Sequence, residues 1–553
     1  MAVDSSAQPA LERAEEAQDL LDAVSKLLVD FIRTADESAP ARAQGLPPNA
    51  GEVNTLVQSL KPDELVTKLA FSLPPSEGRG RDGLLETISS VLKYSVNTWD
   101  QGFMDKLYSS TNPVGIVSEL VLAVLNTNSH VYNVSPALTL LEKTTARQFA
   151  NLFQFKGPRA GGVTCQGGSS SNLTSLIIAR NTLYPETKSG GNAAGGHTFA
   201  IFTSAHGHYS VEKAATISGF GASAVVKVAV DAEGRMCPQD LREKILTAKS
   251  HGRTPLYVNV TAGTTVLGSY DPFTEISAVC KEFGMWMHID GSWGGPAIFS
   301  ARHRSRLDGC GLADSLTVNP HKMMNVPVTC SFLLTNDVAV FKRANTLAAG
   351  YLFHSDDDDD DANDSNGGEQ KDTYWDLADL TLQCGRRADS FKLAMAWVYY
   401  GAAGFERQID HAFDMARHLA DLVDAHPDFR LASTNPPPCL QVCFYYAPGG
   451  VLLGEQRQGT ETTTSTAFAA TNGTGNSQEL EKAKKENSRR TAVMVQALIA
   501  RGFMIDYAPG PYGSFFRAVV NCQTLRTTVE GLLKALDAIG PEVVGQQKLS
   551  NGM

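Results

Sequence analysis

The sequence predicts an α/β fold with a large domain, whose mostly parallel sheet is flanked by helices, and a smaller C-terminal α+β domain. Two observations predict this fold. Between about residues 155 and 335 short apolar runs alternate with segments of helical periodicity, and after residue 440 strand-like runs return. Because strand–helix alternation builds a parallel sheet with helices on both faces, we expect functional side chains on loops at the carboxyl ends of the strands.

The strands expected in the large domain are apolar on successive residues, which is typical of strands covered on both faces. They span residues 198–202, 224–230, 256–260, 285–289 and 330–334. A helix between two of them has Pro238 in its first turn, Leu241 and Ile245 on one face, and ends at Gly252. The smaller domain is expected to contain strands at residues 440–446, 504–507 and 515–520, and a closing helix at residues 525–539.

Shifts in composition divide the chain into four parts. They are a flexible N-terminal extension (1–50), an N-terminal helical segment (51–110), the large domain (111–395) and the small domain (396–553). The extension contains one amphipathic segment, residues 20–33, with helical spacing. Two loop insertions are expected, at 355–370, where six aspartates follow one another, and at 455–478, which is rich in Thr and Gly. A metal-binding role for the aspartate run is the less favoured alternative, because flexible repeats rarely preorganise a site.

Composition excludes several classes of protein. With 42% hydrophobic and 19% charged residues among 553, the chain is typical of a soluble globular protein. Its net charge of −11 argues against nucleic acid or an anionic membrane as a partner, and no apolar stretch is long enough to cross a bilayer. The nine cysteines are scattered, and the close pair Cys439 and Cys443 lacks a second pair of zinc ligands. We therefore expect no metal site and a cytoplasmic location, since no secretory signal is visible.

Lys322 and Asp290 are the first candidate functional residues. Lys322 follows the apolar strand that leads into residues 317–322, and Asp290 ends the strand at residues 285–289. A lysine amine forms a Schiff base with an aldehyde cofactor, and a carboxylate keeps a pyridine nitrogen protonated so that the ring accepts electrons. Each residue alone has an ordinary explanation, a solvated strand end for the lysine and a turn or helix cap for the aspartate.

Three further segments lie at predicted strand ends in the same domain. Residues 167–172, Gly-Gly-Ser-Ser-Ser-Asn, precede a helical run, so that free N–H groups and the helix dipole attract an anion. His208 follows another strand and is placed to stack on a flat ring, although a lone histidine is more often structural. Residues 261–265 end a third strand with hydroxyls and a glycine. Their joint occurrence at strand ends indicates convergence on one ligand.

These segments resemble the pyridoxal-phosphate-dependent group II amino acid decarboxylases, in the branch that acts on glutamate, cysteine sulfinate or aspartate. The resemblance runs from about residue 92 to the C-terminal helix. Its most specific segments are residues 261–265, 288–290, 293–295, 319–322, 382–386 and 515–517. It implies fold type I, pyridoxal 5′-phosphate as cofactor, loss of the α-carboxylate of an acidic amino acid as CO₂, and an obligate homodimer with active sites at the subunit interface.

The resemblance also implies roles by position. The cofactor-binding positions are Lys322, Asp290, His208, Ser169, Ser170, Thr261, Asn319 and His321. Among them Lys322 binds the aldehyde, Asp290 pairs with the ring nitrogen and His208 stacks on the ring. The two serines, Asn319 and His321 match phosphate-binding positions, and Thr261 matches a residue near the ring. Arg517 resembles the arginine that grips the substrate α-carboxylate, for which a planar fork is suited.

Two places depart from the family pattern. A tyrosine on a mobile loop reprotonates the product in the family, and Tyr374 is the candidate here, although its spacing to Gln383 differs. Lys106 stands where glutamate decarboxylases have glutamine. We expect Lys106 to receive the distal acid of a short substrate such as aspartate or cysteine sulfinate, and the alternative is a surface lysine turned to water.

Two other functions remain open at this point. One is another fold type I reaction, an aminotransferase or a carbon–carbon lyase, because one fold hosts many chemistries. The second is a non-catalytic relative that serves as a binding partner. The resemblance at residues 382–386 and 515–517 favours the decarboxylase, and the joint presence of Lys322, Asp290 and His208 disfavours a non-catalytic protein.

Overall fold

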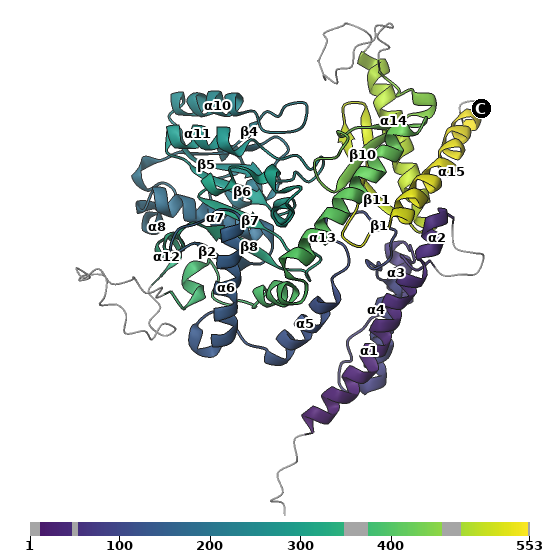
Figure 1. The fold of residues 1–553 in the computed structure, drawn as a ribbon, viewed down its shortest axis with the longest axis horizontal. Coiled ribbons are helices and arrows are strands. Elements are labelled where there is room, and N and C mark those ends of the chain that lie inside the picture. Colours follow the sequence, from purple (N-terminus) through teal and green to yellow (C-terminus); the bar gives the residue numbers. More distant parts are fainter. Residues whose placement is uncertain (1–11, 47–53, 348–373, 456–476, 551–553) are drawn as a thin grey trace, which may run out of the picture.

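The computed structural model describes residues 12–46, 54–347, 374–455 and 477–550, and its two sheets lie in two domains (Figure 1). The large domain contains a seven-stranded sheet of order β2-β8-β7-β6-β5-β3-β4. Its strands are β2 (Gly161–Cys165), β3 (Phe199–Ser204), β4 (Val225–Val228), β5 (Thr254–Thr261), β6 (Trp286–Gly291), β7 (Ser315–Val318) and β8 (Ser331–Thr335). Only β8 runs antiparallel to its neighbours, so the predicted mostly parallel sheet is confirmed.

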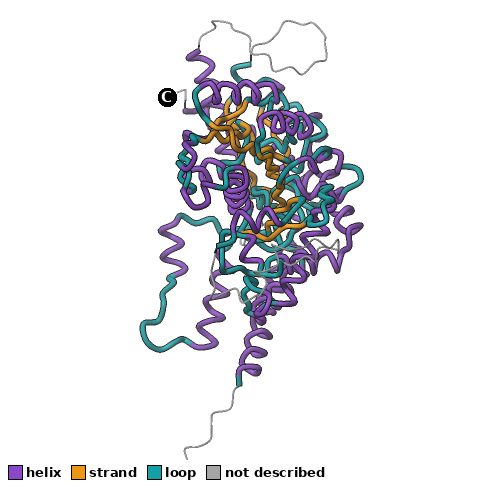
Figure 2. The backbone as a smooth tube through the Cα atoms, turned by 90° about the vertical axis from the view of Figure 1, so that its left-hand side faces the viewer, coloured by secondary structure: helices purple, strands orange, loops and turns teal. Residues whose placement is uncertain are grey.

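Helices cover both faces of this sheet, as Figure 2 also shows. One face packs against α7 (Gly168–Leu183), α9 (Ser210–Ile217) and α12 (Ala339–Asn345). The other packs against α6 (Pro136–Leu152), α10 (Pro238–Ser250) and α11 (Phe273–Phe283). Strand β6 shows why the strands are apolar throughout. Trp286 joins the core beneath α7, whereas Met287 and Ile289 join the opposite core, because successive side chains point to opposite faces.

The small domain contains a five-stranded sheet of order β1-β11-β12-β10-β9. Its elements are β1 (Phe103–Met104), β9 (Phe429–Leu431), β10 (Gln441–Tyr446), β11 (Met504–Gly510), β12 (Gly513–Val519), α14 (Ser477–Ala500) and α15 (Arg526–Ser550). The three predicted strands and the closing helix are present. No strand was predicted at β1, which lies in the segment expected to be helical (51–110); it pairs in parallel with β11 and so extends the small-domain sheet.

One long helix, α13 (Ser390–Ala425), joins the two domains. Its first part packs near α5 (Pro113–Leu125) and α6, and its later part packs near α15 and β10. The backbone departs from helical geometry at Gly401, where φ is 67°, a conformation that favours glycine. This kink lies five residues after the domain boundary that we predicted at residue 396.

Of the N-terminal helices, the first extends away from both sheets (Figure 1), whereas the second packs against α15. These helices are α1 (Arg13–Glu37), α2 (Ala39–Gln44), α3 (Pro62–Leu69) and α4 (Gly80–Tyr94). Helix α1 contains the predicted amphipathic segment and contacts α4 through an ion pair of 2.6 Å between Asp19 and Arg81. The last part of the predicted flexible extension is held in place. Arg42 is buried there and forms two hydrogen bonds to Asp100.

Parts of several predicted segments lie outside the described residues. They are residues 1–11 and 47–50 of the extension, the whole acidic insertion at 355–370, and residues 456–476 of the second insertion. Each helix in the described ranges, including the short α8 (Glu186–Gly190), is too short or too polar to traverse a lipid bilayer.

Candidate active site

A cavity of about 260 Å³ opens at the carboxyl ends of the parallel strands, where the sequence places the functional side chains. Seven of the predicted residues line it: Ser169, His208, Thr261, Asp290, Asn319, His321 and Lys322. They come from α7 and from the loops or strand ends after β3, β5, β6 and β7. The parallel topology thus brings together residues that are more than 150 positions apart.

The lining of the cavity fits pyridoxal phosphate. Oxygen atoms of Thr261, Ser292 and Asn319 are buried without a hydrogen-bond partner among the described residues, although interior polar atoms are normally paired. A polar ligand would supply these partners. At Gly168, where α7 begins, a Cβ atom would lie 2.4 Å from Ser292 Oγ and 2.9 Å from Asn319 Nδ2, so any side chain there would close the end of the cavity that faces the helix N-terminus.

Asp290 is held by neutral donors at both of its oxygens. Oδ1 accepts the Ser292 backbone N–H at 3.1 Å, and Oδ2 accepts the side-chain amide of Asn172 at 2.8 Å. Burial acts to raise the pKa of Asp290, but these hydrogen bonds and the charges of Lys322 and His208 outweigh it, so that the pKa lies below its usual value. The carboxylate is therefore ionised and no cation contacts it directly among the described residues.

The bases around Asp290 have lowered pKa values. Burial lowers the pKa of Lys322, and the negative charge of Asp290 opposes this shift. Burial also lowers the pKa of His208, and the negative charge of Asp290 again opposes the shift. Burial lowers the pKa of His321 to about 4. A lysine with a lowered pKa has a larger share of the neutral amine, which is the form that attacks an aldehyde.

Arg517 lies beside the cavity rather than in its wall. Its Nη1 donates to the carbonyl of Thr265, a cavity residue, at 3.0 Å. Its Nη2 lies 2.8 Å from Asp506 Oδ2, because Arg517 and Asp506 are register partners on β12 and β11. The buried Nε of Arg517 has no partner among the described residues, which leaves a donor for a further acceptor.

Lys106 does not line the cavity, but it joins Arg517 through the same carboxylate. Its Nζ lies 3.0 Å from Asp506 Oδ2 and 3.2 Å from Asp105 Oδ2. Burial acts to lower the pKa of Lys106, yet the hydrogen bond to Asp506 and the charge of Asp105 outweigh it and raise the pKa. Lys106 was expected to be a free cation for the substrate, whereas here it is an ammonium already paired with two carboxylates.

Tyr374 lies apart from the cavity of its own chain. Its ring stacks on the ammonium of Lys342 at 4.8 Å, and its carbonyl accepts a hydrogen bond from Lys143 at 2.5 Å. Ser170 is also absent from the cavity lining, although its neighbour Ser169 in the first turn of α7 belongs to it. The two positions therefore remain predictions that the geometry of one chain does not bring into the cavity.

Several cavity residues were not predicted. They are Gly168, Asn172, Tyr209, Gly263, Thr265, Ser292 and Trp293. All seven stand in or next to segments that the sequence already singled out, so the signal that was available is proximity to a motif. Gly263 has φ of +86°, and a Cβ atom there would lie 2.7 Å from the backbone nitrogen of Gly294.

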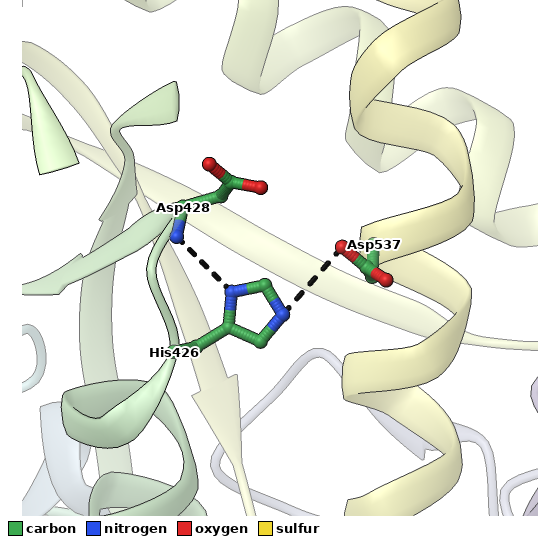
Figure 3. Close-up of side chains that lie close together, drawn as sticks. All are labelled: His426, Asp428 and Asp537. Atoms are coloured by element: carbon green, nitrogen blue, oxygen red, sulfur yellow. Dashed lines mark hydrogen bonds and ion pairs between the residues drawn. The ribbon is translucent and has the colours of Figure 1, made fainter. Parts of the chain in front are cut away.

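A second group of titratable side chains lies in the small domain, where His426, Asp428 and Asp537 come together (Figure 3). The backbone N–H of Asp428 donates to His426 Nδ1 at 3.2 Å, and His426 Nε2 lies 3.5 Å from Asp537 Oδ1. Asp428 Oδ1 also accepts the backbone N–H of Gly449 at 2.6 Å. Both ring nitrogens are thus occupied, and the group joins the turn before β9 to α15.

Comparisons with known proteins agree with this geometry. Residues 64–447 match the family model of the pyridoxal-dependent decarboxylase conserved domain. The chain is 55% identical over 537 residues to L-aspartate decarboxylase dtxS4 of Metarhizium robertsii, which covers 97% of this chain and 99% of that protein. It is 36% identical to a glutamate decarboxylase-like protein of Gibberella zeae, over 85% of this chain and 89% of the relative.

Solved structures show the same fold. The crystal structure of mouse CSAD superposes with a TM-score of 0.77 at 31% identity, and covers 94% of this chain and 98% of its own. The structure of Oryza sativa TDC with PLP and tryptamine has a TM-score of 0.78 at 21% identity, over 97% and 99% of the two chains. The family model and the two relatives cover most of the chain, including every cavity residue. The chain therefore belongs to the pyridoxal-dependent decarboxylase family.

Proposed function

We propose that this decarboxylase removes the α-carboxylate of L-aspartate, releasing CO₂ and leaving β-alanine. The observation that carries the proposal is the 55% identity, over 97% of the chain, to a relative named as an L-aspartate decarboxylase. The more distant glutamate decarboxylase-like relative and mouse CSAD, at 36% and 31% identity, support the wider class of acidic substrates.

The spacing of two cations supports a short substrate. Lys106 Nζ and Arg517 Nη2 both contact one oxygen of Asp506, at 3.0 and 2.8 Å. They therefore lie close enough together for the two carboxylates of a four-carbon acid to reach both. Aspartate has one methylene fewer than glutamate between its carboxylates and is the shorter of the two acids. Arg517 would hold the α-carboxylate with its unpaired Nε–H, and Lys106 the distal one.

Pyridoxal phosphate, when bound, supplies an electron sink for the bond between Cα and the departing carboxylate. Within the cavity Lys322 would offer its amine to the aldehyde, Asp290 would keep the ring nitrogen protonated and His208 would lie against the ring. Ser169, Ser170, Asn319 and His321 would hold the phosphate, and Thr261 lies near the ring. Arg517 would bind the α-carboxylate of the substrate and so fix the orientation of the bond that breaks.

A homodimer accounts for the residue that the cavity lacks. We propose that Tyr374 donates the proton to Cα in the cavity of a second copy, since it does not line the cavity of its own chain. The exposed side of α5 supports such a partner, because apolar faces of this kind mark protein interfaces. Its exposed apolar side chains are Ile116, Val117, Leu120, Val121, Val124 and Leu125. A cytoplasmic location is proposed too, as all nine cysteines are free.

The substrate is tested with purified full-length protein and pyridoxal phosphate. Aspartate, glutamate and cysteine sulfinate are supplied separately, and the amines are identified and quantified. We expect β-alanine to form with the highest kcat/KM. A higher value for glutamate or cysteine sulfinate would remove aspartate as the preferred substrate and leave the decarboxylase intact, whereas release of no CO₂ from any of the three would contradict the class of substrate.

The dimer is tested by complementation. Lys322→Ala and Tyr374→Phe chains are each expected to be nearly inactive alone, and mixing them under conditions of subunit exchange should restore part of the activity. Restoration requires that the two residues act in one site from different chains. No recovery in exchanged dimers would mean that Tyr374 does not act in the cavity of a second copy, and full activity of Tyr374→Phe alone would place Tyr374 outside the reaction.

A further inference from the structure

Behind the cavity, three polar or aromatic side chains of β6 point in one direction. Residues 286, 288 and 290 alternate along the strand, so their side chains lie on the face that α7 covers. On the neighbouring strand β7, Ser315 is the register partner of His288. Asn172, in the second turn of α7, lies above the strand and contacts both His288 and Asp290. All of these residues are buried.

They form one continuous hydrogen-bonded chain. Trp286 Nε1 donates to Ser315 Oγ at 2.9 Å, and Ser315 Oγ lies 2.8 Å from His288 Nδ1. His288 Nε2 lies 3.0 Å from Asn172 Oδ1. The Asn172 amide nitrogen then donates to Asp290 Oδ2 at 2.8 Å and to Ser210 Oγ at 2.9 Å. Every polar atom of the Asn172 side chain is thus in use.

The chemistry of its two ends fixes the direction of this chain. An indole N–H only donates and an ionised carboxylate only accepts. Ser315 therefore accepts a hydrogen bond from Trp286 and donates one to His288 Nδ1. The ring proton of His288 is then on Nε2. The Nε2–H group donates a hydrogen bond to Asn172 Oδ1, so the NH₂ group of Asn172 must face Asp290. Burial lowers the pKa of His288 to about 4, and the whole chain is neutral at physiological pH.

We propose that Asn172 and His288 are positioning residues for the cofactor, which act through Asp290 on the ring nitrogen. The inference rests on the proposed function, because it requires Asp290 to face the pyridine ring. A neutral chain orients the carboxylate and leaves its negative charge uncompensated, so that the charge is met by the protonated ring nitrogen. A cationic donor in place of Asn172 would neutralise Asp290 and weaken that contact.

The test compares two cofactors that differ in one atom. Full-length protein freed of cofactor is titrated with pyridoxal 5′-phosphate and with its 1-deaza analogue, which has CH in place of the ring nitrogen and the same aldehyde and phosphate. The native protein should bind pyridoxal phosphate at least about tenfold more tightly than the analogue, since a hydrogen bond to a charged group is worth about 1.5–3 kcal/mol. Asp290→Asn should abolish most of this preference.

Two variants of one residue separate the two contacts of His288. His288→Gln keeps an N–H near the position of Nε2 and so retains the donor to Asn172, whereas His288→Asn keeps only the contact to Ser315. We expect His288→Gln to retain the preference for pyridoxal phosphate within about twofold, and His288→Asn and Asn172→Ala to reduce it by roughly three- to tenfold. Ser175→Ala, which removes a buried hydrogen bond from the same helix, is the control and should leave the preference unchanged.

The ratio of the two affinities distinguishes positioning from a structural role, because a general loss of packing weakens both cofactors equally. If His288→Asn and Asn172→Ala weaken the binding of both cofactors equally, so that the ratio of affinities is unchanged, the inference is overturned while the role of Asp290 stands. A native protein that does not distinguish the two cofactors overturns the assignment of Asp290 as well. Should His288→Asn fail to fold, Asn172→Ala carries the test alone, because it removes the donor that contacts Asp290 directly.

Discussion

Two aspartates of this protein contact donor groups of different chemistry. Asp290, at the cavity, accepts from the Ser292 backbone and the Asn172 amide, which are neutral. Asp506, beside the cavity, meets Lys106 and Arg517, which are cations. The first carboxylate is buried and keeps its negative charge, whereas the second has a side chain that is 30% exposed and is surrounded by opposite charge.

The difference between the two aspartates indicates which one interacts more strongly with a charged ligand. A buried carboxylate with neutral partners interacts strongly with a cationic group that enters the cavity, because little solvent screens it. Around Asp506 two cations and two carboxylates already compensate one another, and the Lys106 side chain is 45% exposed. Substitutions at the cavity should therefore change activity by orders of magnitude, and those at the outer edge of the Asp506 cluster by small factors.

The largest effect is expected at the amine of the cavity. Lys322→Ala should lower kcat with aspartate by at least roughly 10³-fold, since removal of a covalently acting group costs more than any single hydrogen bond. In the native protein, borohydride reduction followed by peptide mapping should place the cofactor on Lys322. Lys249→Ala, at an exposed position of α10, is the control. Label recovered on another lysine would refute the assignment.

A smaller effect is expected at Arg517, where the two regions meet. Arg517→Lys keeps the charge and loses the planar fork, so KM for aspartate should rise by about ten- to a hundredfold with less change in cofactor affinity. Steady-state kinetics and cofactor titration on the same preparation separate these quantities. A variant that loses cofactor and substrate binding together would show that Arg517 stabilises the Thr265 loop and not the substrate.

The sequence predicted the cavity better than its surroundings. Lys322 and Asp290 could be placed because they follow apolar strands, and parallel strands bring their carboxyl ends to one edge. Strands β1, β2 and β9 were missed, since Gly-Gly-Val-Thr-Cys of β2 offers little apolar signal and β1 and β9 have only two and three residues. The five apolar runs that were predicted as strands in the large domain all occur, with ends that shift by up to two residues.

Partnerships between side chains could not be predicted, because they depend on how elements pack. His288 has the pattern of an ordinary strand residue, and its role follows only when α7 is placed against β6. Lys106 and Asp506 are 400 positions apart and meet because β1 joins β11. Charge at a sequence position therefore says little about whether that charge is already paired in the fold.

Acid should lower the stability of the folded protein through the buried His288. The pKa of His288 is lowered by burial to about 4 in the folded state, against about 6.5 in an unfolded chain. Below pH 6.5 the unfolded chain therefore binds a proton that the folded one refuses, and stability falls as the pH decreases from 6.5 towards 4. Full burial of the group makes this loss about 3 kcal/mol.

Thermal unfolding of the protein freed of cofactor, between pH 8 and pH 5, measures this effect. His288→Gln should flatten the decline in Tm on the acid side, because it removes the titrating group and retains the hydrogen bond to Asn172. His251→Gln, at an exposed position, is the matched control and should leave the slope as it is. Equal slopes in the native protein and in His288→Gln would show that His288 is not held neutral by the fold.

The smallest effect is expected at Lys106, where the comparison is sharpest. If Lys106 receives the distal carboxylate, Lys106→Gln should lower the ratio of kcat/KM for aspartate to that for glutamate. A desolvated charged hydrogen bond would change this ratio by ten- to a hundredfold, but exposed ion pairs are worth at most about 1 kcal/mol. Since Lys106 is half-exposed and already paired with Asp105 and Asp506, we expect a change of about three- to fivefold.

A matched variant shows whether so small a change is specific. Lys227, 39% exposed and 2.9 Å from Glu212, resembles Lys106 in exposure and pairing but lies on β4. Lys227→Gln should leave the aspartate-to-glutamate ratio unchanged, while Lys106→Gln lowers it through KM for aspartate. If both variants leave the ratio unchanged, Lys106 is a surface lysine turned to water, and discrimination between the two acids must come from the length of the substrate against Arg517. A change above tenfold would instead mean that substrate binding removes Lys106 from solvent and from its two carboxylates, so that the cluster around Asp506 rearranges as the cavity fills.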